Sequence, residues 1–334
     1  MKIKIIIGVL FVLLLLIIDY GRRNNFEYGQ ETSFVDPNSI KYDDQGDEDL
    51  AKALRLAIKK LEPLHQLPVK PEPGDWLSSH SESGQSFDRY LVSKPIRPTS
   101  KRNKLYVVPM GTFDKRAAEI ITDSATFMGL YFQIPVVLMK TESLEKVPDH
   151  AKRENPYSGN KQILSTWVLY DFLKPQLPED ALAMIAFTSI DLWPGKDWNF
   201  VFGQASLRER VGVWSIARNG NPNIDEKSYV QCLTRTLKTA THETGHMLSI
   251  KHCTAWNCNM AGANSLEESD QHPLYLCPEC VAKVCWATRS DINKRYAELL
   301  SFTQKHQLSE TAAFYLRSID ALKANEIIRD NMGK

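Results

Sequence analysis

The chain has 334 residues, of which 43% are hydrophobic and 24% are charged, and its formal net charge is +1. This composition is typical of a globular protein, and the length allows one large or two small domains. The nearly neutral charge argues against binding to nucleic acid, so we expect no nucleic-acid partner.

The first 20 residues differ most in composition from the rest of the chain. Lys2 and Lys4 precede an apolar run from Ile5 to Ile18, which fits the core of a signal peptide better than a span of about 20 residues. No cleavage site with small residues follows. We therefore predict an uncleaved, single-pass N-terminal membrane anchor over residues 1–20, with a cleaved signal peptide as the alternative. The basic residues on its two sides nearly balance, so the side of the membrane that holds the body stays open.

Residues 21–100 are expected to form a linker and an N-terminal extension. The stretch up to residue 46 is polar, and residues 47–61 have the apolar spacing of an amphipathic helix. Four prolines between positions 63 and 73 then interrupt regular structure. We interpret His80 as a surface or packing residue rather than a metal ligand.

Strands and helices alternate in the middle of the chain. We predict strands at residues 105–110, 134–139, 181–190, 199–204 and 212–216. We predict helices at residues 114–130, 163–173, 229–248, 290–307 and 309–328, the last two capped by Asp291 and Ser309. The apolar run at 181–190 suits a central strand covered on both faces, and residues 191–195 are expected to turn out of it. The alternation predicts an α/β (α+β) fold with a mixed sheet.

One stretch contains the pattern H-E-x-x-H, followed six residues later by a third histidine. On a helix, His242 and His246 share a face and can bind one metal ion, while Glu243 is placed to act on a metal-bound water. His252 can reach the same ion only if the helix breaks near Ser249 and the chain folds back. Three imidazoles suit Zn²⁺ and leave a fourth position open, which distinguishes a catalytic zinc from a structural one.

Two pairs of cysteines follow at a spacing typical of zinc sites. The pairs are Cys253 with Cys258, and Cys277 with Cys280. Four thiolates predict a second zinc of the closed, structural kind. Cys232 and Cys285 are left as free, buried thiols. Thiols kept for zinc favour a reducing compartment, which conflicts with export of the body.

The whole motif, H-E-x-x-H-x-x-S-x-x-H-C-x-x-x-x-C-x-M with a downstream C-x-x-C, resembles that of the archaemetzincins, a branch of the metzincin metallopeptidases. The resemblance extends upstream from Trp198 to Arg218, and more loosely over residues 105–300. It implies a metzincin-like catalytic domain at residues 101–310, with a mixed twisted sheet, an active-site helix and a zinc-stabilised C-terminal subdomain. A C-terminal helix over residues 311–334 follows. It also implies that Met260 forms the hydrophobic turn beneath the metal.

Ser249 departs from the family, which usually has glycine at this position because glycine adopts the left-handed conformation that ends the helix. Serine in that conformation costs on the order of 1 kcal/mol. The alternative is an ordinary φ at Ser249, with its hydroxyl capping the last carbonyls of the helix.

We interpret the chain as a zinc-dependent metallopeptidase with two zinc ions, acting on a peptide or protein substrate. His242, His246 and His252 would bind the catalytic zinc, and Glu243 would be the general base. The strand near residues 199–206 is the expected edge for an extended peptide, and the resemblance suggests aminopeptidase-like cleavage.

The alternative is a catalytically silent, zinc-stabilised interaction module tethered to a membrane, which would not need the carboxylate of Glu243. We expect a monomer. No cysteine precedes Cys232, which excludes a pro-segment that silences the zinc with a thiolate. Any masking of the site by residues 21–100 must therefore be steric.

Overall fold

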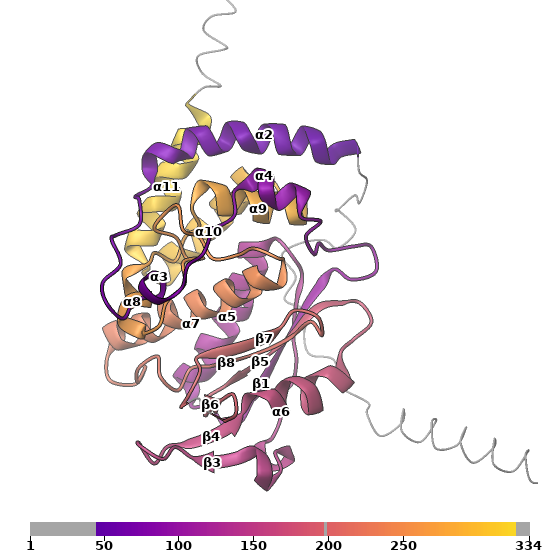
Figure 1. The fold of residues 1–334 in the computed structure, drawn as a ribbon, viewed down its shortest axis with the longest axis vertical. Helices are drawn as coiled ribbons and strands as arrows, with labels where there is room; N and C mark the ends of the chain where they lie inside the picture. The colour runs from indigo at the N-terminus through magenta and orange to yellow at the C-terminus, as the bar shows by residue number, and fades with distance from the viewer. Residues whose placement is uncertain (1–44, 197–198, 325–334) are drawn as a thin grey trace, which may run out of the picture.

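The structure is a computed structural model that describes residues 45–196 and 199–324. A five-stranded sheet lies at its centre, in the order β2-β1-β5-β8-β7 (Figure 1). Its strands are β1 (Lys104–Met110), β2 (Val136–Leu138), β5 (Ala181–Thr188), β7 (Gly203–Ser206) and β8 (Val211–Ser215). The first four strands in this order are parallel, and β7 pairs antiparallel with β8 at the edge. The predicted mixed α/β sheet is confirmed.

Strand β5 lies between β1 and β8, and every one of its residues is buried. This confirms the central strand predicted from its apolar run. Alternate side chains of the neighbouring β1 enter two cores, because successive residues of a strand point to opposite faces. Leu105 and Val107 pack with the helices α5 (Lys115–Phe132) and α7 (Glu226–Met247). Tyr106 and Val108 pack in the other core, against the helical segment that follows residue 165.

Helix α7 carries the H-E-x-x-H motif and matches the predicted helix closely. It begins after Asp225, whose carboxylate accepts a hydrogen bond from the Ser228 N–H, as expected of an N-cap. Its inner side carries the buried residues Cys232, Leu233, Thr236, Leu237 and Ala240, and Tyr229 is partly buried. The helix is thereby fixed against the sheet before it reaches the metal motif.

The C-terminal part is helical, and two of its helices were not predicted. These are α8 (Leu266–Gln271) and α9 (Pro278–Thr288), and α9 starts with a proline at its first position, where no backbone donor is needed. Helices α10 (Ile292–Lys305) and α11 (Ser309–Lys323) follow. Asp291 caps α10 as predicted, because its carboxylate accepts hydrogen bonds from the N–H groups of Asn293 and Lys294. Ser309 is not a cap: it is the first residue of α11, after Leu308.

The described part of the N-terminal extension packs on these C-terminal helices. It contains α2 (Gln45–Leu61), α3 (Trp76–Ser79) and α4 (Phe87–Val92), and α2 lies along α9 and α11 while α4 lies on α9 (Figure 1). Leu54 and Leu61 are buried in the core that also holds α9. Asp47 receives hydrogen bonds from the guanidinium groups of Arg97 and Arg289. Residues 45–97 therefore share one core with the metal-binding part of the chain.

A three-stranded sheet in the order β3-β4-β6 corrects three predicted elements. Its strands are β3 (Lys152–Glu154), β4 (Lys161–Leu164) and β6 (Asp191–Trp193). Ile163 and Leu164 belong to β4, so the predicted helix starts later, with α6 (Ser165–Trp167), and continues in π-helical form through Val168–Leu173. Residues 191–193 form a strand because they pair with β4, and the turn begins only after them. The strand predicted at 199–204 lies further along, as β7.

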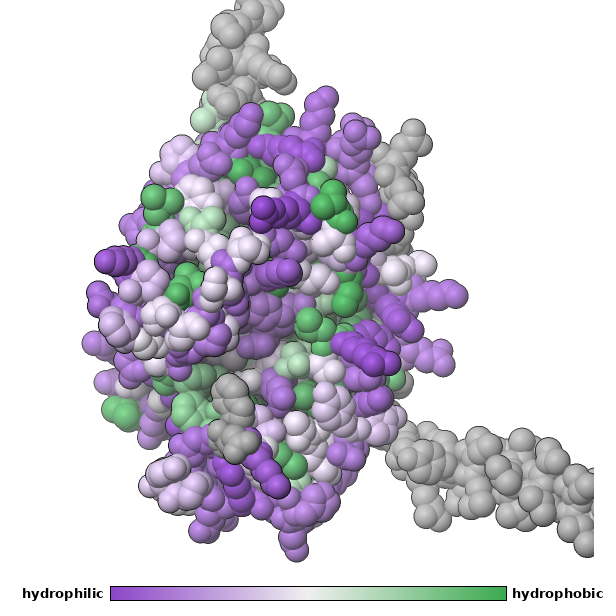
Figure 2. All heavy atoms as spheres, in the orientation of Figure 1, coloured by the Kyte–Doolittle hydropathy of each residue, from purple (hydrophilic) through white to green (hydrophobic). Residues whose placement is uncertain are grey.

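The prediction of a single-pass N-terminal membrane anchor is corrected. In the part of the chain that the structure describes, no helix is both long and apolar enough to cross a membrane. Residues 1–20, on which that prediction was based, lie outside the described ranges. Polar residues cover most of the face drawn in Figure 2, where apolar residues appear in small groups.

Candidate metal centre

The last turns of α7 bring two imidazoles together. The Nε2 atoms of His242 and His246 lie 3.0 Å apart. A Zn–N bond of about 2.0–2.1 Å places two tetrahedral ligand nitrogens about 3.3 Å apart, so this spacing fits one shared zinc ion.

Hydrogen bonds at the other ring nitrogens fix which nitrogen can bind a metal. The Nδ1 atom of His242 donates to the carbonyl of Asn259 at 2.7 Å, and that of His246 donates to the carbonyl of Ile250 at 2.6 Å. A carbonyl can only accept, so Nδ1 carries the proton and Nε2 keeps its lone pair. Burial lowers the pKa of both imidazoles, which keeps them neutral, as a ligand must be.

Helix α7 ends next to Ser249, as the sequence predicted. Ser249 has a φ of 66°, in the left-handed region, and the N–H groups of Leu248 and Ile250 both donate to the carbonyl of Gly245. The chain then turns back and places the His252 ring 5.3 Å and 4.9 Å from the other two imidazole rings, between centroids. One ligand nitrogen from each of the three histidines lies within 4.8 Å of the others. The left-handed conformation predicted for Ser249 is confirmed.

Glu243 lies beside this cluster, and pockets open on both sides of it. Desolvation by the surrounding protein raises the pKa of Glu243 to about 7, so the group can exchange a proton near neutral pH. One pocket, of about 90 Å³, is lined by Glu243, His242 and Phe202 among others. A larger one, of about 520 Å³, is lined by His246, His252 and Leu207 among others. Glu243 and His242 therefore line one pocket, while His246 and His252 line the other.

Met260 packs directly beneath the histidine cluster. It is 1% exposed, and a Cβ added to Gly245 would lie 2.6 Å from its Sδ atom. Its carbonyl accepts a hydrogen bond from the Cys253 N–H at 2.7 Å, which ties it to the chain just after His252. The role of Met260 as the turn beneath the metal stays a prediction.

The four cysteines of the predicted second site also meet. The sulfur atoms of Cys253, Cys258, Cys277 and Cys280 lie within 4.8 Å of one another, and all four side chains are buried. The Sγ atoms of Cys253 and Cys277 are 3.6 Å apart, close to the spacing of about 3.8 Å that Zn–S bonds of about 2.3 Å impose. Backbone N–H groups of Met260 and Cys277 point at the Cys258 sulfur at 3.4 and 3.2 Å. These donors suit a thiolate cluster that binds zinc.

Lys283 is a partner of the cysteine cluster that the sequence did not predict. It is 1% exposed, and its Nζ lies 3.8 Å from the Cys280 sulfur. Burial alone would lower the pKa of Lys283, but the nearby cysteines raise it. Its ammonium group would offset part of the negative charge of four zinc-bound thiolates. Cys232 and Cys285 lie apart from this cluster as buried, free thiols, as predicted.

Comparison with known proteins identifies the family of this chain. The model of peptidase family M54 matches residues 168–285. Archaemetzincin-2 of Rattus norvegicus is 34% identical over 270 residues, which cover 72% of this chain and 75% of that protein. The chain belongs to the archaemetzincin family. It is accordingly a zinc metallopeptidase.

Two further relatives are similar to this archaemetzincin. Archaemetzincin-2 of Homo sapiens is 34% identical over 261 residues, covering 68% of this chain and 71% of that protein. The crystal structure of archaemetzincin from Methanopyrus kandleri is 30% identical, with a TM-score of 0.44, and the match covers 56% of this chain and 96% of that one.

The N-terminal extension of this archaemetzincin reaches the histidine cluster. The carboxylate of Glu82 accepts from the Nδ1 atom of His252, with Oε1 at 2.9 Å and Oε2 at 3.1 Å. The Trp76 ring meets the His252 ring edge-on, with 4.9 Å between centroids. Sequence analysis missed Glu82, because a single acidic residue in a polar stretch carries no local signal. As predicted, His80 is exposed, and it stacks on the ring of Trp76.

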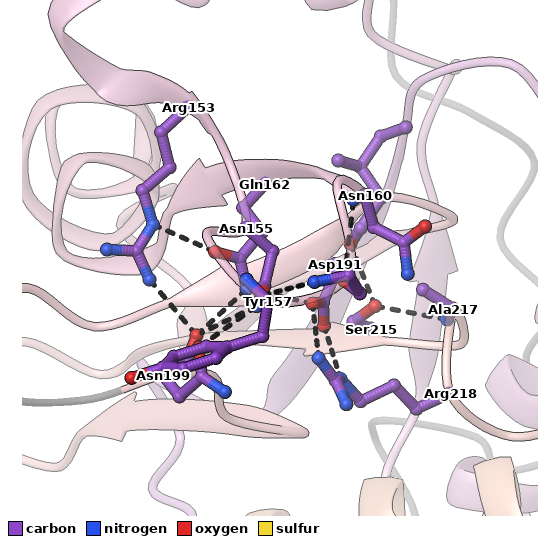
Figure 3. Close-up of polar contacts among 12 residues, drawn as sticks. Arg153, Asn155, Tyr157, Asn160, Gln162, Asp191, Asn199, Ser215, Ala217 and Arg218 are labelled. Atoms are coloured by element: carbon purple, nitrogen blue, oxygen red, sulfur yellow. Dashed lines mark hydrogen bonds and ion pairs between the residues drawn. The ribbon is translucent and has the colours of Figure 1, made fainter.

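A polar network supports the loop before the edge strand β7 (Figure 3). The buried carboxylate of Asp191 accepts hydrogen bonds from Nε and Nη2 of Arg218, at 2.8 and 2.7 Å, and from Gln162 at 2.8 Å. The carbonyl of Asn199 accepts from Arg153 and Gln162, both at 3.0 Å. The network therefore fixes the start of the loop that leads through Phe202 to β7.

Proposed function

We propose that this archaemetzincin hydrolyses peptide bonds at the histidine cluster, with Glu243 as general base. His242, His246 and His252 would hold the catalytic zinc through their Nε2 atoms. The observation that carries the proposal is the convergence of three neutral imidazoles next to Glu243, which faces a pocket.

Zinc, when bound, supplies Lewis acidity to a water molecule and to the scissile carbonyl. Glu243 would accept the proton of the attacking water and later deliver it to the leaving amine. Met260 would pack against α7 at Gly245 and so keep the zinc ligands in position.

The edge strand β7 is the proposed docking edge for an extended peptide. Its outer side has no neighbouring strand among the described residues, so backbone groups there can pair with a substrate strand. Phe202, just before β7, lines the same pocket as Glu243. A peptide paired along β7 would therefore pass over the histidine cluster.

The proposal includes a second, structural zinc on Cys253, Cys258, Cys277 and Cys280. Cys253 directly follows His252, so a closed site at the cysteines would fix the loop that carries the third histidine. The near-tetrahedral sulfur spacing and the buried Lys283 support this assignment.

A comparison of the parent with Glu243→Ala tests the function. Both proteins should hold the same amount of zinc, while hydrolysis of a broad peptide library should fall by about 10²-fold or more in the variant. Library members with free and with acetylated amino termini separate aminopeptidase-like cleavage from internal cleavage. If the variant cleaves at the parent rate, Glu243 is not the general base. If the parent itself cleaves nothing in the library, the silent interaction module is favoured.

A further inference from the structure

The third histidine is supported differently from the other two. His242 and His246 donate to carbonyls that lie within the motif or on the turn that follows it. His252 instead donates to the side chain of Glu82, which is 170 positions earlier in the chain. Both carboxylate oxygens lie within hydrogen-bond distance of Nδ1, and the pair is largely shielded from water, with side chains 28% and 18% exposed.

A carboxylate on the outer nitrogen of a ligand histidine has two consequences. It fixes the proton on Nδ1 and the orientation of the ring, and it raises the basicity of Nε2 toward a metal. His252 needs this support more than the other two histidines, because it stands on a loop rather than on a helix.

We infer that Glu82 is a positioning residue for the catalytic zinc site, acting through His252, and that the N-terminal segment is a built-in part of the metal centre. This inference rests on the proposed function, since it takes the three histidines to be the zinc ligands. Glu82 is inferred to act through His252, so we call it a positioning residue and not a catalytic one.

Further bonds from the same segment hold the turn between His246 and His252. Gln85 donates to the carbonyl of Ser249 at 3.3 Å and accepts from the Lys251 N–H at 3.2 Å. The hydroxyl of Tyr90 donates to the carbonyl of Leu248 at 2.7 Å. The segment that contains Glu82 therefore forms hydrogen bonds with the chain before and after Ser249.

The beginning of the segment, at Trp76, is also held by contacts with the rest of the chain. The Trp76 N–H donates to the Glu268 carboxylate at 2.8 Å, and a Cβ added to Gly262 would lie 2.5 Å from the Trp76 ring. The ring that meets His252 edge-on thus rests on the loop after Met260. These contacts define where Glu82 stands, so its alignment with His252 is a property of the folded chain.

The test measures zinc affinity at the histidine site in the full chain, by competition with a chelator of known affinity. Glu82→Ala should weaken this affinity by about 10–100-fold, as loss of such a partner does in other zinc sites. Glu82→Gln should weaken it less, because the amide oxygen still accepts the hydrogen bond but lacks the charge. Asp88→Asn is the matched control: it removes a carboxylate of the same segment that pairs with the exposed Arg55, and affinity should stay within about twofold.

Two further readouts separate positioning from a general effect on the fold. At saturating zinc, kcat of Glu82→Ala should fall while KM stays close to that of the parent, and the cysteine-bound zinc should remain. If zinc affinity is unchanged and only KM rises, the carboxylate contacts substrate and the positioning role is wrong. If the cysteine-bound zinc is lost together with the histidine-bound one, Glu82 supports the fold in general, which also overturns the inference.

The parent protein distinguishes failure of this inference from failure of the proposed function. A parent that binds no zinc at its histidines contradicts the proposed function itself. A parent that binds zinc there, with the same affinity as Glu82→Ala, contradicts only the role of Glu82.

Discussion

The hydroxyl of Ser249 accepts a hydrogen bond from the backbone N–H of Ile96 at 3.0 Å. Ser249 stands in the left-handed conformation that glycine adopts most readily, and Ile96 belongs to the N-terminal extension. Ser249 therefore has a hydrogen-bond partner in the N-terminal extension. Serine at this position has a strained backbone, but its hydroxyl connects the N-terminal extension to the end of the helix.

This relationship predicts different effects for two substitutions of Ser249. Ser249→Ala keeps the left-handed strain and loses the hydrogen bond, so the free energy of unfolding should fall by about 1 kcal/mol. Ser249→Gly loses the same bond but relieves strain of about 1 kcal/mol, so its stability should stay near that of the parent. Urea unfolding of the zinc-loaded proteins measures both. An alanine variant as stable as the parent would show that the bond to Ile96 contributes nothing.

Gly245 and Met260 form a second close pair that can be tested. Gly245→Ala in the parent places a methyl group against the Met260 sulfur and should lower stability by about 1–2 kcal/mol through overpacking. In a Met260→Ala background the clash is absent, and the same change should raise stability by up to about 1 kcal/mol, because alanine is the better helix former. A double-mutant cycle in urea unfolding measures this reversal of sign. The same sign in both backgrounds would contradict the close packing.

Asp191 should link the polar network to substrate binding. Asp191→Asn removes the charge of a buried carboxylate that forms a bidentate pair with the partly exposed Arg218, which should cost about 1.5–3 kcal/mol of stability. Because the network holds the loop before β7, KM for peptides should rise, while zinc content should not change. Urea unfolding, peptide kinetics and metal analysis check the three parts. A destabilised variant with an unchanged KM would mean that the network supports the fold without placing the docking edge.

The sequence was most informative where one short segment contains the whole pattern. The shared face of His242 and His246 follows from helix geometry, and the return of His252 follows from the need for a break near Ser249. The central strand β5 was equally clear, because a nearly continuous apolar run of this kind is typical of a strand buried on both faces.

The elements and site residues that were not predicted depend on contacts with distant parts of the chain. Residues 191–193 resemble a turn by composition and become a strand only because β4 lies beside them. Helix α9 starts at Pro278, within the second cysteine pair. The cysteine spacing predicted a zinc site there, and no helix was predicted. Glu82 and Lys283 meet their partners only after folding, and neither has a sequence pattern that marks it.

Zinc content per chain tests the central claim most directly. Metal analysis of the purified full chain should give two zinc ions, one at the three histidines and one at the four cysteines. A chelator should remove the ion at the open histidine site first and abolish hydrolysis while the fold persists, since closed four-thiolate sites release zinc less readily. A single zinc ion per chain, or loss of the fold together with the first ion removed, would contradict the account.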